Sequence, residues 1–175
     1  MEDLRFPVGD FTFPQHATTE EERVQWIREI AETPANLRVA VAGLNVEQLA
    51  TPYRPGGWTV RQVVHHLPDS HLHSYIRFKF ALTEDKPVIK PYDEARWAEL
   101  PDAVDTPVDV SLQLLEALHT RWVRCLQTLG DADWRRTFQH PERGLVRLEQ
   151  NLALYAWHGR HHVAHITALR RWMGW

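Results

Sequence analysis

Residues 155–165 read Tyr-Ala-Trp-His-Gly-Arg-His-His-Val-Ala-His, and they lie within an uninterrupted helical pattern near the C-terminus. Core-type side chains recur there every three or four positions, at Leu148, Leu152, Tyr155, Gly159, His162, Ile166, Leu169 and Met173. This spacing places side chains on one face of an α-helix that packs against a core. We therefore predict a last helix from about Val146 to Trp172, with His162 pointing inward.

His158 is one turn before His162, and residues four apart stack along one helix face. His161 and His165 form a competing pair with the same spacing, but they align with Trp157, farther from the buried stripe. We prefer His158 and His162 as metal ligands. We assign His161 and His165 to the polar face or to a supporting role.

A second histidine cluster supplies a candidate third ligand. The two clusters together hold eight of the 11 histidines, and the second one comprises His65, His66, His71 and His73. Histidine is the commonest metal ligand. His66 lies on the inward stripe of its predicted helix, and facing side chains of helical bundles converge on metals in the core. The alternative is a set of buried imidazoles satisfied by neighbouring polar groups.

Two residues are candidates for supporting the site. Asp69 is three residues after His66 and is a candidate acceptor for the free ring N–H of a ligand histidine, although we prefer the alternative of a solvated surface carboxylate. Tyr155 is one turn before His158 and is a candidate for orienting a substrate oxygen, or else a core residue. We assign no role in the site to His119, which borders the apolar face of its helix.

Two further helices have clear start signals. Thr19 and Glu22 form a capping box, which predicts a first helix that continues through Pro34 to Gly43 or Leu44. Thr59 and Gln62 form the capping box of the second helix, and Pro68 should bend that helix just after His66.

The third long helix is predicted between Thr106, as its cap, and Gly130, as its left-handed stop, with Pro107 at the first helical position. We expect residues 131–146 to form a loop, with a short extended piece at Thr137 to Gln139. No stretch shows the alternation of a well-paired sheet.

The linker from Thr83 to Thr106 is long enough to join parallel neighbours, and it holds one short helical candidate from Asp93 to Leu100. Four long helices predict an all-α fold, a four-helix bundle. Residues 1–175 are predicted to be a single domain, in which residues 1–17 form an N-terminal arm over the bundle.

Composition narrows the class of protein. The chain has 175 residues, 43% of them hydrophobic and 25% charged, which is typical of a globular protein. It lacks an apolar run long enough for a membrane span and a signal-peptide pattern at its start, so we expect a cytoplasmic protein. A net charge of −3 without a basic run argues against nucleic acid as a partner. The single Cys125 excludes an internal disulfide and a multi-cysteine metal site.

Three neutral histidines leave a bound ion its full charge and an open coordination position, which is the arrangement of a catalytic site. Such an ion can activate water, or it can hold a thiol as a thiolate. Between His158 and His162 the chain has Gly, Arg and His. The glutamate of the His-Glu-x-x-His peptidases is absent, which excludes a peptidase of that type.

The sequence resembles the YfiT branch of the DinB-like metalloenzymes over nearly its whole length. The resemblance rests on Phe6 to Gly9, Gly57 to His71, Ser74 to Lys79, Lys90 to Glu94 and Tyr155 to Ile166. It implies a four-helix bundle of up-down-down-up topology, a homodimer, and one divalent metal per subunit, zinc or nickel. The implied ligands are His66, His158 and His162. Pro68 departs from the family, which usually has a small helix former there.

The resemblance implies two enzymatic functions. YfiT-like proteins are regarded as metal-dependent hydrolases, in which the metal activates water for attack on a small-molecule substrate. Related DinB-like enzymes transfer low-molecular-weight thiols such as bacillithiol to electrophiles. Arg54, Arg61 and Arg77 could neutralise an anionic cosubstrate or solvate the surface. A third hypothesis is a non-catalytic, metal-stabilised dimer module with Trp172 and Trp175 at its partner surface.

Overall fold

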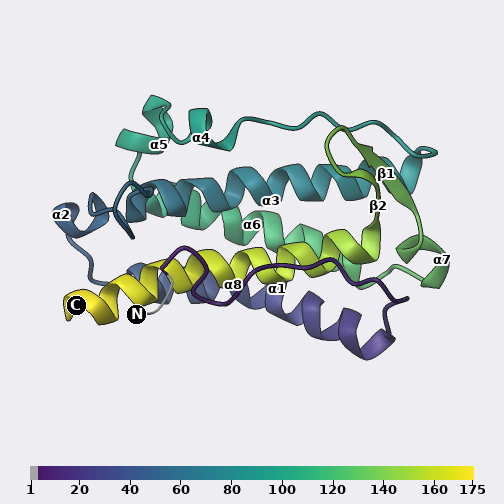
Figure 1. Cartoon of the computed structure of the whole chain (residues 1–175), viewed down its shortest axis with the longest axis horizontal. Helices are drawn as coiled ribbons and strands as arrows, with labels where there is room; N and C mark the ends of the chain where they lie inside the picture. Colours follow the sequence, from purple (N-terminus) through teal and green to yellow (C-terminus); the bar gives the residue numbers. More distant parts are fainter. Residues whose placement is uncertain (1–3) are drawn as a thin grey trace.

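Four long helices lie side by side in the computed structural model, which describes residues 4–175 (Figure 1). They are α1 (Glu20–Val41), α3 (Val60–Thr83), α6 (Val108–Leu126) and α8 (Leu148–Met173). α1 and α8 run in one direction, and α3 and α6 run in the other (Figure 1). The predicted four-helix bundle with up-down-down-up topology is confirmed.

The order of the helices around the bundle determines which side chains can meet. α1 packs against α8 and α6, and α3 packs against the same two helices. Two apolar clusters fill the interior. One contains Phe78, Trp122 and Leu152, and the other contains Leu37 and Leu169. α3 and α8 are therefore neighbours that run in opposite directions, and both contribute side chains to each apolar cluster.

The predicted starts of the first two helices are confirmed. The Thr19 and Thr59 side chains each accept a hydrogen bond from the backbone N–H three residues later, and the Glu22 and Gln62 side chains accept from the cap N–H in return. Both helices continue through their internal prolines, Pro34 in α1 and Pro68 in α3. The start of α3 is thus fixed two turns before His66.

The predicted ends of the third helix are wrong. The residue before the first turn of α6 is Pro107, which cannot supply a side-chain cap, so Thr106 does not cap it. The helix ends at Leu126, and Gly130 has a φ of −92° rather than a left-handed conformation. Gly130 instead begins the short helix α7 (Asp131–Trp134), where its N–H donates to the Asp133 carboxylate.

A β-hairpin occupies most of the segment that we expected to be a loop, and its first strand contains the short extended piece that we expected at Thr137 to Gln139. Strands β1 (Thr137–His140) and β2 (Gly144–Arg147) pair antiparallel. Phe138 lies opposite Val146, and both side chains are buried. Gly144 has a φ of +72°, which suits glycine at the tight turn. Strands of four residues are too short for their alternation to stand out in the sequence.

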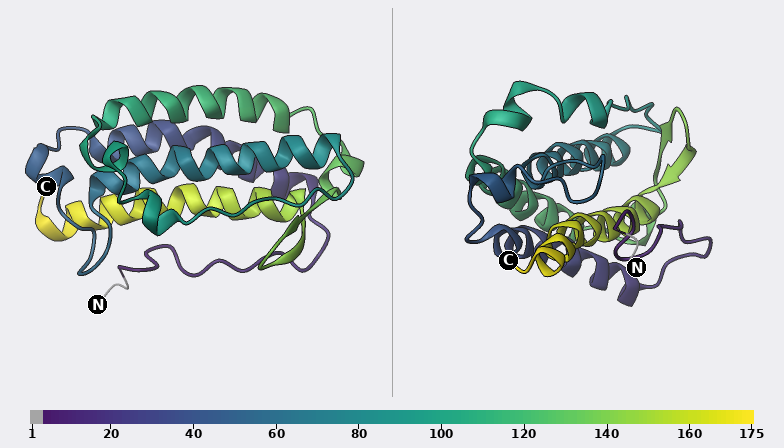
Figure 2. Two further views of the ribbon diagram at one scale, coloured as in Figure 1. Left: turned by 90° about the horizontal axis from the view of Figure 1, so that it is seen from above. Right: turned by 60° about the vertical axis from the view of Figure 1, so that its left-hand side comes forward.

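Three short helices lie in the connections: α2 (Val46–Leu49), α4 (Glu94–Trp97) and α5 (Pro101–Asp105). α4 confirms the short helix expected near Asp93 to Leu100, whereas α2 and α5 were not predicted. The connection from 84 to 107 returns along the outside of the bundle (Figure 2), which allows α3 and α6 to be parallel.

The N-terminal segment lies along α8 (Figure 1). The Trp157 indole N–H donates to the Gly9 carbonyl at 3.0 Å, and the Gln150 amide donates to the Pro14 carbonyl at 3.2 Å. Residues 1–3 of the predicted arm lie outside the described residues. Within residues 4–175, no helix combines the length and the hydropathy that a membrane span requires.

Candidate metal centre

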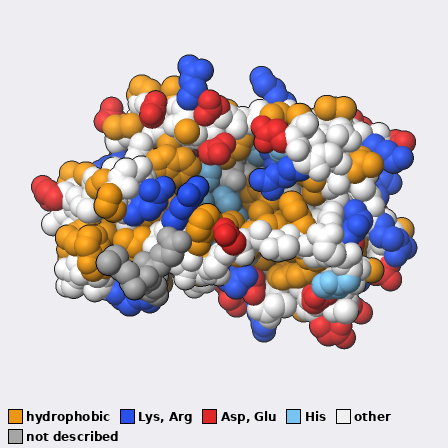
Figure 3. All heavy atoms as spheres, in the orientation of Figure 1, with side chains coloured by type: hydrophobic (Ala, Val, Ile, Leu, Met, Phe, Trp, Pro, Cys, Tyr) orange, Lys and Arg blue, Asp and Glu red, His pale blue; other side chains and the backbone are white. Residues whose placement is uncertain are grey.

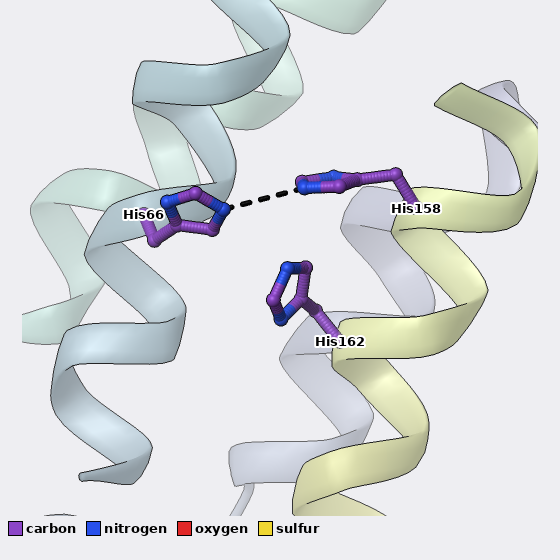
Figure 4. A group of neighbouring side chains, drawn as sticks. All are labelled: His66, His158 and His162. Atoms are coloured by element: carbon purple, nitrogen blue, oxygen red, sulfur yellow. Dashed lines mark hydrogen bonds between the residues drawn. The ribbon is translucent and has the colours of Figure 1, made fainter. Parts of the chain in front are cut away.

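The three predicted ligands meet between α3 and α8. His66 projects from α3 toward His158 and His162 of α8 (Figure 4). Each residue offers one ring nitrogen, and these three atoms lie within 4.8 Å of one another. The antiparallel packing of α3 and α8 brings together residues that are 92 positions apart in the chain.

The spacing of the nitrogens fits a metal ion. The Nε2 atoms of His66 and His158 are 3.3 Å apart. Two nitrogens bound tetrahedrally to one ion at about 2.0 Å each would be separated by about 3.3 Å. The structure therefore already holds these two donors at the separation that a tetrahedral site requires.

Burial keeps the three ligands neutral, as a metal ligand must be. It lowers the pKa of His66 to about 3 and lowers those of His158 and His162 well below the ordinary value for histidine. The neighbouring histidines act in the same direction, because each one opposes a charge on the others. Lone pairs rather than protons are thus available at neutral pH.

A chain of hydrogen bonds fixes which nitrogen of His158 carries the proton. The Ile30 carbonyl can only accept, so His119 Nδ1 donates to it, at 2.6 Å. Neutral His119 then accepts at Nε2 from His71 Nδ1, at 2.8 Å. His71 Nε2 in turn accepts from His158 Nδ1, at 3.1 Å. Nε2 of His158 is therefore left with its lone pair, facing His66.

A second chain does the same for His162. The Arg5 carbonyl accepts from His165 Nε2 at 3.1 Å, so His165 Nδ1 is unprotonated. That atom lies 3.3 Å from His162 Nδ1, which must then be the donor. His162 Nε2 therefore keeps its lone pair. Two backbone carbonyls, one from α1 and one from the N-terminal segment, thus set the tautomers of both ligands on α8.

We gave two alternatives for His161 and His165. The first, a polar face, is wrong, whereas the hydrogen bond between His162 and His165 agrees with the second, a supporting role, for His165. Only 7% of His161 and 2% of His165 are exposed. The ring of Tyr53 stacks on His165, and the ring of Phe6 lies against His161. Helical phase alone could not show that a loop and the N-terminal segment would cover this side of α8.

His161, His162 and His165 form a second group whose nitrogens lie close enough to hold an ion. Both ring nitrogens of His165 already take part in hydrogen bonds. His161 and His165 do not line the cavity described below, whereas His66, His158 and His162 do. A substrate can therefore reach an ion in the first group, which is the better candidate centre.

The structure places Asp69 away from a ligand nitrogen. Within residues 4–175 its side chain forms no hydrogen bond to a histidine, and His71 occupies the supporting position for which Asp69 was a candidate. Burial, and secondarily Asp102, raise the pKa of Asp69 to about 6.

Tyr155 lies next to the ligands. It is 4% exposed, its ring packs against His158, and its hydroxyl accepts a hydrogen bond from Ser70 at 3.3 Å. Tyr155 and Ser70 line a cavity of about 460 Å³ together with the three histidines. Histidine side chains lie at the floor of a hollow in this face, and charged side chains surround it (Figure 3).

The fold and the site together indicate a helical-bundle metalloprotein. Residues 29–166 match the model of the DinB superfamily, and the chain belongs to this family. It is 57% identical, over the full length of both chains, to proteins of Bacillus cereus and Bacillus thuringiensis that carry the name "putative metal-dependent hydrolase".

Solved structures agree with this assignment. YfiT from Bacillus subtilis, described as "a probable metal-dependent hydrolase with an unusual four-helix bundle topology", is 50% identical over 99% of both chains, with a TM-score of 0.96. A second four-helix bundle protein matches with a TM-score of 0.58 and 18% identity, which supports the fold alone; it covers 83% of this chain and 98% of that one. The predicted resemblance to YfiT is confirmed.

Proposed function

We propose that the protein is a metal-dependent hydrolase in which His66, His158 and His162 hold one divalent ion, zinc or nickel. The observation that carries this proposal is the pair of hydrogen-bonded chains that direct the lone pairs of two ligands toward an open cavity. When bound, such an ion lowers the pKa of water toward neutrality and polarises a substrate oxygen. The names of the relatives support the same class of reaction.

The residues around the ligands have defined roles in this proposal. Ser70 donates to the Tyr155 oxygen, which leaves the Tyr155 O–H free to donate to a substrate oxygen. Trp58 and Trp157 provide apolar walls that limit the access of bulk water. In the overall reaction an ester or amide bond breaks, the acyl group receives OH from water, and the leaving group receives the remaining proton.

The experiment compares purified protein, protein stripped by a chelator, and protein reloaded with zinc or nickel on a panel of aryl esters and amides. We expect turnover that is lost on stripping and restored on reloading. Absence of turnover, together with metal-dependent conjugation of monochlorobimane to a thiol, would replace this proposal by the thiol-transferase alternative. Stoichiometric metal without either reaction would favour the non-catalytic dimer module.

The homodimer and the cytoplasmic location remain predictions. Light scattering of the purified protein tests the first, and fractionation of cells that express the tagged chain tests the second.

A further inference from the structure

Arg77 lies on the same helix as His66 and lines the same cavity. Its side chain is only 9% exposed. Arg54 and Arg61, the other two basic residues that we considered for binding an anion, bond to Pro55, Tyr53 and Thr106 and do not line the cavity. The structure therefore singles out Arg77 among the three.

The Arg77 guanidinium lacks a protein partner within residues 4–175. No carboxylate in this part of the chain forms an ion pair with it, and its buried Nε–H has no hydrogen-bond acceptor. Glu94 and Glu142 line the cavity but are exposed and do not pair with Arg77. A buried charge is unfavourable unless it is paired, so an unpaired arginine that lines a cavity calls for an anion from outside.

A second hydrogen-bond donor, His140, lines the same cavity and lies close enough to Arg77 for the two side chains to interact electrostatically. His140, which is 8% exposed, accepts the Glu142 backbone N–H at its Nδ1 atom. In the neutral ring the proton must then be on Nε2, which makes that nitrogen a donor. Arg143, which is exposed, also lines the cavity, interacts electrostatically with His140 and adds positive charge. Arg77, His140 and Arg143 thus form a group of donors, which we call the Arg77 subsite.

We propose that the Arg77 subsite binds a carboxylate or phosphate group of the substrate, while the reactive bond lies at the three histidines. The planar guanidinium donates two parallel hydrogen bonds to such groups, which a lysine cannot do. This inference rests on the proposed hydrolase function, because it assigns the charged end of that enzyme's substrate.

The distance along α3 between Arg77 and His66 determines how long the proposed substrate must be. Eleven residues separate it from His66, a rise of about 16 Å along the helix axis. The arginine side chain shortens this span, because side chains in a helix lean toward its N-terminus. A ligand that reaches both ends is therefore elongated, with several bonds between its anionic group and the bond that is cleaved.

The first test measures anion binding without turnover. The Arg77 Nε–H resonance, assigned by its loss in Arg77→Gln, is followed by NMR while inorganic phosphate, acetate or neutral acetamide is added to purified protein, with and without its metal. We expect a saturable shift with phosphate or acetate and none with acetamide. The anion that binds more tightly identifies the substrate group as a phosphate or a carboxylate. An unchanged resonance with both anions would overturn the proposal.

Matched variants locate the binding. Lys79→Gln removes the same charge from an exposed position two residues later on α3 and should leave anion affinity unchanged. Arg77→Lys keeps the charge but loses the bidentate geometry, and we expect an affinity about tenfold or more weaker, followed through the His140 ring resonances. If Arg77→Gln fails to fold, Arg77→Lys still tests whether Arg77 binds the anion. Equal affinity in Arg77→Lys and the wild type would contradict the role of Arg77.

The second test links the Arg77 subsite to turnover. 4-Nitrophenyl acetate is compared with 4-nitrophenyl half-esters of dicarboxylic acids of increasing length. We expect kcat/KM to be highest for a long half-ester, and Arg77→Gln to remove this preference while turnover of the acetate ester persists. If neither these esters nor the panel of aryl esters and amides is cleaved, the hydrolase proposal fails, and the NMR titration still decides whether the subsite exists. A wild-type preference for the acetate ester would contradict the inference.

Discussion

His71 is the position at which the account of the ligand chains can be tested most sharply. It is fully buried and joins His158 to His119 through its two ring nitrogens. Replacing it by Phe keeps a ring of similar size against Trp122 and Tyr155 but removes both nitrogens. The Nδ1–H of His158 then has no acceptor, and Nε2 of His119 has no donor.

The magnitude follows from these two lost hydrogen bonds. A buried polar group left without a partner costs about 1–3 kcal/mol. The tautomer of His158 with the proton on Nε2, which cannot bind an ion through that atom, is no longer disfavoured. Removing the partner of a ligand histidine typically weakens metal binding by about 10- to 100-fold. We expect a loss in this range for His71→Phe, together with lower stability.

The assay is competition for zinc against a chromophoric chelator at pH 7.5. His65→Phe is the matched control. His65 is 4% exposed and also uses both ring nitrogens, toward Ser111 and the Thr106 carbonyl, but within residues 4–175 its ring forms no hydrogen bond with a ligand ring. We expect it to lose stability and to keep its zinc affinity. Equal zinc affinity in His71→Phe and the wild type, or equal losses in both variants, would refute the reasoning.

Three further predictions concern stability, each measured by urea unfolding of the metal-free protein. Burial lowers the pKa of His119 to about 4, so the unfolded chain binds a proton before the folded one as pH falls from 6.5 to 4. Stability should therefore fall by about 1.4 kcal/mol per pH unit from this residue alone, and equal stability at pH 7 and pH 5 would contradict it. Asp69 has a raised pKa of about 6, so its charged form opposes folding above pH 6. Asp69→Asn should therefore stabilise the folded protein by roughly 1–2 kcal/mol at pH 8, after allowance for solvent screening, and should have no effect at pH 3. The variant should bind zinc as tightly as the wild type. A loss of zinc affinity would restore the supporting role of Asp69. A Cβ atom at Gly159 would lie 2.5 Å from Thr33 Oγ1. Gly159→Ala should therefore destabilise by about 1–2 kcal/mol, the cost of overpacking less the gain in helix propensity, and adding Thr33→Ala should recover most of this loss. A stabilising Gly159→Ala would show that α1 moves aside.

Sequence signals that act within one helix predicted the starts of two helices and the position of the last one. The capping boxes at Thr19 and Thr59 placed the starts of α1 and α3 correctly, because each box satisfies backbone groups within four residues. The periodic stripe of core-type residues through His162 predicted the position of α8 correctly. The ends of α6 were missed, because Thr106 and Gly130 lie beside further short helices, α5 and α7, that take them into other backbone conformations.

The candidate site was predicted only in part, because tertiary contacts complete it. Helical phase and spacing brought His66, His158 and His162 together. The links through His71, His119 and His165 depend on the approach of α6 and the N-terminal segment, which no periodicity shows. The high density of histidines was the sequence feature that could have indicated these links. Of our two alternatives for the remaining histidines, a polar face or a supporting role, the second holds for His71 and His165, which contact the ligands His158 and His162.

The central claim is that His66, His158 and His162 together hold one divalent ion. Elemental analysis of purified wild type beside His66→Ala, His158→Ala and His162→Ala tests it directly, with His73→Ala as a control histidine that does not line the cavity. We predict one equivalent of metal in the wild type and the control and loss of metal in each ligand variant. Full retention in any ligand variant would remove that residue from the site, and retention in all three would contradict the account.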